Sequence, residues 1–146
     1  MPRLARLDAT GVLHHIIIRG IERGKIFRHD HDKDNFIDRL AAILPKTQTA
    51  CYGWALMSNH AHFLFRSGTG GISNVMRRLL TGYAIWFNRK YRRHGQLFQN
   101  RYKSIICQED LYFKELVRYI HFFQRGAKTV RTLKSTLGWP SNSILT

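Results

Sequence analysis

The feature that most constrains the fold is a pair of strand-like runs with only two residues between them. Ala50–Met57 and His60–Arg66 both read as strands, and Ser58 and Asn59 alone separate them. Two strands joined by so short a loop pair as an antiparallel hairpin. The sequence therefore predicts an antiparallel sheet that contains this hairpin.

Further elements are predicted on both sides of the hairpin. Val12–Arg19 is apolar and β-branched and stops at Gly20, which is typical of a strand. Asp32–Lys46 carries a helical apolar stripe with acidic residues in its first turn. A last strand is predicted at Tyr102–Cys107. A second helix follows the hairpin, and the members of its apolar face are Ile72, Val75, Met76, Leu79, Tyr83, Trp86 and Phe87.

The order of these elements predicts the fold class. Strand, helix, strand, strand, helix, strand is the α+β, ferredoxin-like β-α-β-β-α-β plan, with one antiparallel sheet and helices on one face. The other face can then carry a site. A further helix, capped by Asp110 and ending near Arg125, is predicted after the last strand. We expect a single domain over residues 1–146, with a basic tail at about 128–146.

The charge of the chain points to a polyanionic partner. Lys and Arg number 24 against 9 Asp and Glu, which gives a formal net charge of +15. Nucleic acid is the usual partner of so basic a domain, and an anionic membrane surface is the weaker alternative.

No segment is long enough to span a bilayer and no signal peptide is evident, so we expect a cytoplasmic protein. Cys51 and Cys107 form neither a disulfide framework nor a C-x-x-C metal motif.

The basic residues gather in clusters along the second helix, around the last strand and in the tail. Tyr91, Phe98 and Tyr102 lie among them, which suits stacking on unpaired bases. The residues that we expect to contact nucleic acid are Arg77, Arg78, Arg89, Lys90, Arg92, Arg93, Arg101, Tyr102 and Lys103.

The candidate metal ligands are His60 and His62, at the start of a predicted strand. Residues i and i+2 of a strand point to the same face, roughly 6.6–6.8 Å apart along the chain. Two imidazoles at that spacing can hold one metal ion. A polar strand edge is the alternative interpretation. A second pair, His29 and His31, lies at a helix start, where we interpret it as solvated helix-capping sequence.

Tyr119 lies in the predicted last helix and is one of the tyrosines that could act as a nucleophile. A phenol has a pKa near 10, so it attacks poorly unless its proton is removed or its target phosphate is polarised. A divalent ion held by two His would polarise a phosphate. The pattern also allows a core role, because Tyr119 shares an apolar face with Tyr112, Leu116 and Phe123. Tyr83 is predicted to lie in the core.

Several separated stretches resemble the single-tyrosine HUH transposases, and most of all the REP-associated tyrosine transposases. The most specific stretch is Leu56–Leu64, which contains His60 and His62. The others follow in the same order and spacing over roughly residues 3–140. They are Leu13–Ile16, Arg19–Gly20, Glu22–Arg23, Ile26–Arg28, Tyr83–Arg89, Gly95–Ser104 and Leu116–His121.

The resemblance implies a function and a mechanism. His60 and His62 would bind Mg²⁺ or Mn²⁺, and Tyr119 would attack a phosphodiester in single-stranded DNA. The products would be a 5′-phosphotyrosine link and a free 3′-hydroxyl, which allows strands to be rejoined without ATP. The resemblance also implies recognition of hairpin DNA and allows a homodimer in which the tyrosine helix serves the partner's His pair.

The sequence departs from the family pattern at Ile21, which replaces a usual Asn after Arg19 and Gly20, and at a position of the expected metal site. Phe123 stands where the family places an Asn that can complete the metal site, and a phenyl ring cannot ligate a metal. Gln124 is adjacent and could substitute if the helix end is distorted; otherwise water fills the gap or the site is weakened. This departure motivates a second hypothesis, a single-stranded nucleic-acid-binding module that does not cleave. A small RNA-binding protein of translation accounts for charge and fold but not for the co-occurring motifs.

Overall fold

The computed structural model describes residues 10–106. The predicted helix with Tyr119, Phe123 and Gln124, the basic tail and Cys107 lie outside the described residues. In chain order the elements are β1 (Leu13–Arg19), the 3₁₀ turn η1 (Ile21–Arg23), α2 (Asp30–Lys46), β2 (Ala50–Leu56), β3 (His60–Arg66), α3 (Ile72–Tyr91) and β4 (Lys103–Ile106).

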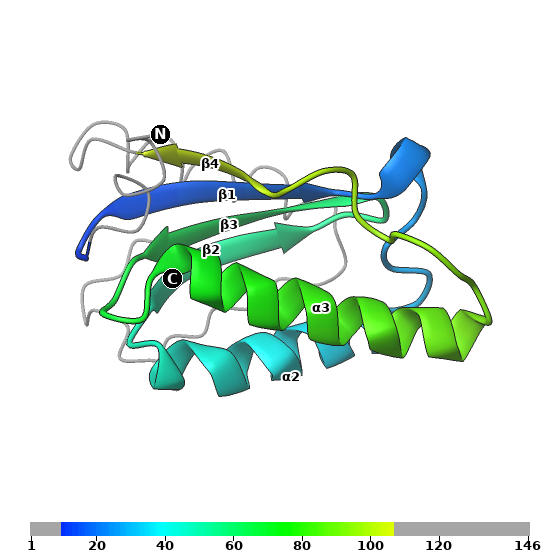
Figure 1. Cartoon of the computed structure of the whole chain (residues 1–146), viewed down its shortest axis with the longest axis horizontal. Helices are drawn as coiled ribbons and strands as arrows, with labels where there is room; N and C mark the ends of the chain where they lie inside the picture. Colours follow the sequence, from blue (N-terminus) through cyan, green and yellow to red (C-terminus); the bar gives the residue numbers. More distant parts are fainter. Residues whose placement is uncertain (1–9, 107–146) are drawn as a thin grey trace.

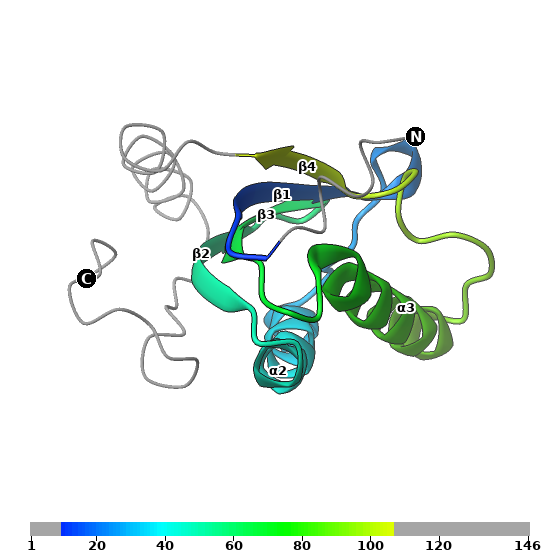
Figure 2. The same cartoon turned by 60° about the vertical axis from the view of Figure 1, so that its left-hand side comes forward.

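The four strands form one sheet in the order β2-β3-β1-β4, and every neighbouring pair is antiparallel. β1 and β3 are therefore the central strands, as the ferredoxin-like plan requires. Figures 1 and 2 show α2 and α3 side by side on one face of this sheet. The predicted α+β class and strand order are confirmed.

The hairpin forms where the sequence predicts it. β3 spans His60–Arg66, and the backbone N–H of Met57 donates to the carbonyl of His60 at 2.8 Å across the turn. α2 begins two residues before the predicted start and ends at the predicted Lys46. Within residues 10–106, η1 is the one element that the sequence did not predict, and it follows β1 directly.

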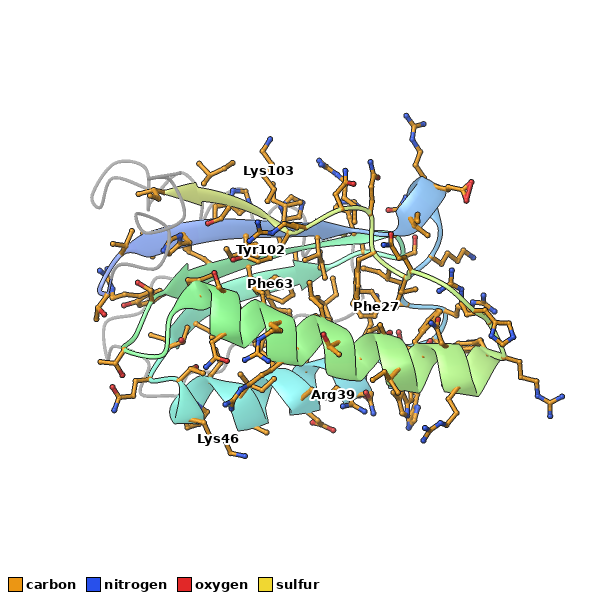
Figure 3. All side chains as sticks on the ribbon, in the orientation of Figure 1. Phe27, Arg39, Lys46, Phe63, Tyr102 and Lys103 are labelled. Carbon is orange, nitrogen blue, oxygen red and sulfur yellow. The ribbon has the colours of Figure 1, made fainter. Side chains whose placement is uncertain are left out.

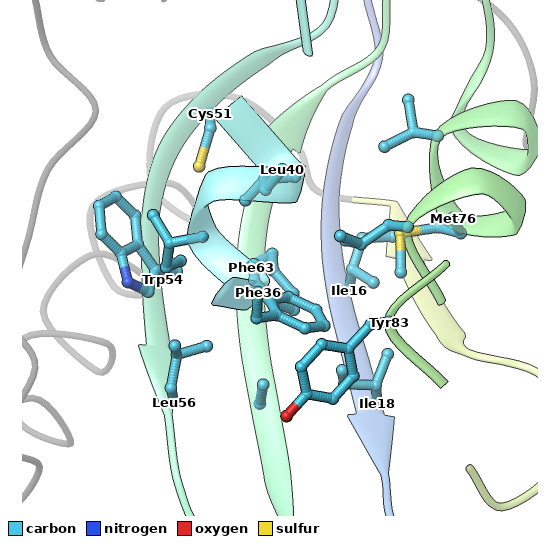
Figure 4. Packing of buried hydrophobic residues seen from close by; sticks show 14 of the residues in the cluster. Ile16, Ile18, Phe36, Leu40, Cys51, Trp54, Leu56, Phe63, Met76 and Tyr83 are labelled. Carbon is cyan, nitrogen blue, oxygen red and sulfur yellow. The ribbon is translucent and has the colours of Figure 1, made fainter. Parts of the chain in front are cut away.

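The core lies between the sheet and the two helices. Figure 4 shows Phe36 of α2 between Phe63 of β3 and Tyr83 of α3. The Phe36 ring stacks on Phe63 with centroids 5.6 Å apart and packs edge to face with Tyr83 with centroids 5.0 Å apart. The Tyr83 hydroxyl donates to the carbonyl of Ile26, and burial raises the pKa of Tyr83 far above its usual value. Full burial of one such side chain contributes about 1.5–3 kcal/mol. Tyr83 is thus a core residue, as predicted.

The alternation of β1 decides which side chains reach each face of the sheet. Ile16 and Ile18 belong to the buried cluster beneath the helices. Because successive strand residues point to opposite faces, His15, Ile17 and Arg19 lie on the face away from the helices. This face is the one on which the candidate site is built.

The start of α2 is held by a buried carboxylate. The predicted capping is confirmed, because Asp32 Oδ2 accepts the backbone N–H groups of Arg28 at 2.9 Å and His29 at 3.2 Å. His29 and His31 are exposed, as predicted, whereas Asp32 is 0% exposed. Lys90 Nζ at 2.7 Å and the Tyr91 hydroxyl at 2.6 Å also donate to it. Burial alone would raise the pKa of Asp32, but these four hydrogen bonds hold it below its usual value.

Asp32→Asn is expected to lower the free energy of unfolding by about 3 kcal/mol. The neutral amide weakens the helix cap and places its NH₂ group against hydrogen-bond donors, and bonds to charged groups contribute about 1.5–3 kcal/mol each. Urea unfolding of the full chain measures the change. Asp38→Asn is the matched control, since Asp38 is exposed on the same helix. A loss under about 0.5 kcal/mol would contradict the assigned role.

The same network sets a pH dependence of stability. Asp32 binds its proton less readily in the folded chain than in the unfolded one, for which the usual pKa is 3.8. Its contribution is therefore present above about pH 4 and is lost as the pH falls through the folded pKa. Asp32→Asn removes this part of the pH dependence, whereas Asp38→Asn leaves it unchanged.

Candidate metal and nucleic-acid site

His60 and His62 lie together on the sheet face away from the helices. In the β1–β3 register His60 is opposite Arg19 and His62 is opposite Ile17. The two imidazole centroids are 5.2 Å apart, with the ring planes at 84°. The strand spacing therefore brings both rings to one place, at the end of the sheet where β1 finishes and β3 begins.

Each of the two rings is oriented through its Nδ1 atom. His60 Nδ1 lies 2.8 Å from Asn59 Oδ1, so it donates to the amide oxygen, and its lone pair is on Nε2. His62 Nδ1 lies 3.0 Å from His15 Nε2. Metal-ligating His residues commonly use one nitrogen for such an orienting hydrogen bond and the other for the ion.

The surroundings keep these rings neutral. Burial lowers the pKa of His62 to about 4, and the charges of His15, His60 and Arg19 add to this effect. Burial lowers the pKa of His60 as well, again with a contribution from Arg19. Burial, followed by Lys103, lowers the pKa of His15. Neutral imidazole is the form that ligates a metal, so the rings need not lose a proton first.

The two imidazoles fit a divalent ion as part of a ligand set. Within residues 10–106, no group of three or more His, Cys, Asp or Glu side chains could hold an ion. The predicted roles of Tyr119 and Gln124, and the consequence of Phe123, concern residues outside the described part of the chain.

The structure adds residues that the sequence did not single out. His15 is buried beside His62, whereas its neighbour His14 lies on the helix face, where its Nδ1 is 2.9 Å from Ser104 Oγ. Only the strand alternation and the β1–β3 register distinguish these two adjacent His residues. The same register places Arg19 beside His60.

The predicted nucleic-acid residues fall into separate groups. Lys103 pairs with Ile17 across β1 and β4, and Figure 3 shows it at the edge of the sheet away from the helices. Arg77, Arg101 and Tyr102 line a cavity of about 660 Å³ at the start of α3. A third group lies at and just after the end of α3, in the helix layer and therefore on the far side of the sheet from the His pair. Its members are Arg89, Lys90, Arg92 and Arg93.

Some of the basic and aromatic residues have structural partners. The Lys90 ammonium pairs with Asp32, and Arg93 donates to Asn88 Oδ1 at 2.7 Å. Tyr91, which we expected to stack on bases, donates to Asp32 and packs against Phe87 with centroids 4.6 Å apart. The exposed cations of the predicted set are Arg77, Arg78, Arg89, Lys90, Arg92, Arg101 and Lys103, and Lys90 is the one among them that is paired with Asp32.

Two further features bear on the function. Cys51 is a free, buried thiol whose pKa burial raises to about 12, so it stays protonated and is a poor nucleophile or metal ligand. In the part of the chain that the structure describes, no helix combines the length and apolar character needed to cross a membrane.

Comparison with known proteins gives a consistent result. The structure resembles that of a REP-associated tyrosine transposase bound to a REP hairpin, with a TM-score of 0.68 and 12% identity over 91% of this chain and 76% of the other. It also resembles a Deinococcus radiodurans R1 protein described as a transposase, with a TM-score of 0.54 and 16% identity over 76% of this chain and 89% of the other. These similarities show the fold.

A search of curated protein sequences finds no significant match. The model of the family described as IS200-like transposases matches residues 9–122, which includes β1 to β4 and the candidate site. The resemblance stated from the sequence motifs is thus confirmed, and the chain belongs to the IS200-like transposase family.

Proposed function

We propose that this protein is a metal-dependent transposase that cuts and rejoins single-stranded DNA through a 5′-phosphotyrosine intermediate. The observation that carries the proposal is the pair of neutral imidazoles of His60 and His62, 5.2 Å apart on one face of the sheet and each oriented through Nδ1. The membership of the chain in a transposase family supports the same proposal.

The residues have distinct roles in the proposed reaction. His60 and His62 hold Mg²⁺ or Mn²⁺, with Gln124 as a further ligand, and Asn59 and His15 fix the two rings. When bound, the ion polarises a phosphoryl oxygen of the DNA. The Tyr119 hydroxyl loses its proton to solvent and its oxygen attacks that phosphorus. The bond to the 3′-oxygen breaks, and this oxygen takes up a proton from solvent and leaves as a hydroxyl. In the reverse direction, a 3′-hydroxyl displaces the tyrosine and reseals a strand.

We propose single-stranded or hairpin DNA as the partner. The net charge of +15 and the exposed cations support a polyanion, and the structural neighbour with a TM-score of 0.68 is bound to a REP hairpin. The cavity formed by Arg77, Arg101 and Tyr102 offers both cationic and aromatic contacts. Lys103 offers a further cation on the face of the His pair.

Organisation and assembly follow from the same reasoning. We propose that residues 1–146 form one domain with a basic tail and act in the cytoplasm, where their DNA substrate is accessible. A homodimer would allow the tyrosine helix of one protomer to serve the His pair of the other. Light scattering of the full chain reports the oligomeric state.

A second candidate function is a binding module that does not cleave DNA. Phe123 favours it, because its ring cannot supply the ligand that the family places there. Such a protein would bind hairpin DNA without forming a covalent product.

Adduct formation separates the two functions. We expect the protein, with Mn²⁺ and 3′-labelled hairpin oligonucleotides that carry randomised single-stranded flanks, to give a labelled band that resists denaturant. The label must be at the 3′ end, because the tyrosine stays on the 5′ phosphate of the downstream fragment. EDTA should abolish the band. Tight binding without any band would instead support the binding module, and a strong preference for single-stranded RNA would support the translation protein.

A further inference from the structure

A small polar cavity adjoins His60 at the end of β1. Its volume is about 350 Å³, and it is lined by Arg19, Gly20, Arg23, Asn59, His60 and Gln99. None of these six residues has an aliphatic or aromatic hydrocarbon side chain. The cavity therefore suits a small charged group better than a nucleobase, which needs an apolar surface on which to stack.

Backbone hydrogen bonds fix the walls of this cavity. The N–H of Gly20 donates to the carbonyl of Asn59 at 2.9 Å, which joins the end of β1 to the hairpin turn. The N–H of Gln99 donates to the carbonyl of Arg19 at 2.8 Å. Three segments that are distant in the sequence are thus joined at one place, and the cavity is built by the fold rather than by flexible surface side chains.

The turn after β1 brings the second arginine to the same cavity. Glu22 and Arg23 both have left-handed backbone conformations, with φ of 52° and 61°. A Cβ atom on Gly20 would lie 1.9 Å from the carbonyl oxygen of Gly24, so only glycine allows the turn to close this tightly. Such conformations are strained in residues with side chains and persist where the surrounding structure imposes them, often at functional sites.

The two arginines bring unbalanced positive charge to the cavity. Arg19 and Arg23 are both exposed, and within residues 10–106 neither guanidinium forms a hydrogen bond or an ion pair. Guanidinium groups bind phosphate oxygens in a bidentate manner. The cavity therefore offers two guanidinium groups to an oxyanion, beside a candidate metal ligand.

We propose that this cavity is an anion subsite in which Arg19 and Arg23 bind a backbone phosphodiester of single-stranded DNA, next to the phosphate that reacts. The assignment of the ligand as DNA rests on the proposed function. The subsite positions the strand and neutralises one phosphate charge, so that the neighbouring phosphate reaches His60 in a fixed register.

Binding without metal tests the subsite independently of cleavage. In EDTA, Arg19→Gln and Arg23→Gln are each expected to weaken binding of a fluorescent single-stranded oligonucleotide roughly tenfold. Each should also reduce the slope of log affinity against log salt by about 0.7, the value for one phosphate contact on a single strand. Because no metal or tyrosine chemistry takes part, failure of the cleavage mechanism would leave this result intact.

The matched control is Lys46→Gln, which removes the same charge. Lys46 is exposed at the end of α2, at the other end of the molecule from η1 (Figures 1 and 3). The affinity of the Lys46→Gln variant for the single-stranded oligonucleotide should stay within about twofold of that of the parent at equal salt. Arginine variants that behave like Lys46→Gln would overturn the proposal.

A smaller probe tests the location of the subsite. Thymidine 3′,5′-bisphosphate should shift the backbone amide NMR signals of Gly20, Asn59 and Gln99, and the double Arg variant should lose these shifts. Inorganic phosphate at the same concentration is the comparison. If it gives equal shifts, and if the variants bind the oligonucleotide as tightly as the parent does, the cavity is an anion site unrelated to DNA and the assignment is overturned.

Discussion

Tyr119→Phe is expected to abolish the covalent DNA adduct while it leaves the affinity for hairpin DNA within about twofold of the parent. The substitution removes only the hydroxyl oxygen that forms the bond to phosphorus, and phenylalanine keeps the volume and apolar surface of the ring. No other group of the ring can replace this nucleophile. The adduct is measured as the denaturant-resistant band, and the affinity by fluorescence anisotropy in EDTA.

Tyr112→Phe is the matched control, because Tyr112 is predicted to share a helix face with Tyr119 and carries the same hydroxyl. It should form the adduct at the rate of the parent. An adduct that persists in Tyr119→Phe would show that another residue is the nucleophile.

Mixing Tyr119→Phe with His62→Ala tests the proposed assembly, since recovery of the adduct requires the tyrosine of one protomer to act at the partner's His pair.

His60→Ala and His62→Ala are each expected to slow adduct formation by roughly 10²–10³-fold, because the ion that polarises the phosphate loses one of two imidazole ligands. Each should also weaken Mn²⁺ binding to the DNA-free protein, which electron paramagnetic resonance of free Mn²⁺ measures directly. This second measurement separates the loss of a ligand from a general loss of activity.

The second His-x-His pair of the chain supplies the control. His31→Ala removes an exposed imidazole of the same motif at the start of α2 and should change neither Mn²⁺ affinity nor the rate. Normal Mn²⁺ binding in both His60→Ala and His62→Ala would contradict the assignment of these residues as ligands.

Local patterns in the sequence predicted much of the fold. The run His60–Arg66 became β3 with the predicted bounds, because its limits depend on a two-residue turn and on an alternation that a strand satisfies locally. The helical stripe of α3 likewise turns Val75, Leu79 and Tyr83 to the core. The order of the elements then left few ways to form one antiparallel sheet, and the observed order is the expected one.

The interactions that cross between distant segments could not be predicted in this way. The burial of Asp32 is one example, because nothing near it in the sequence shows that Lys90 and Tyr91 will reach it from the end of α3. Phe98, expected to stack on bases, packs against the core for the same reason. A side chain's partners depend on how helices dock, and docking is decided by the whole core.

The sequence by itself determined that two imidazoles of this chain share one face of a strand, since the spacing of His60 and His62 sets this directly. Only the tertiary structure decided which side chains surround them. The hydrogen-bond register between β1 and β3 brings His15 to His62 and Arg19 to His60, and the left-handed turn after β1 adds Arg23. A shift of one residue in that register would turn all of these β1 side chains to the other face.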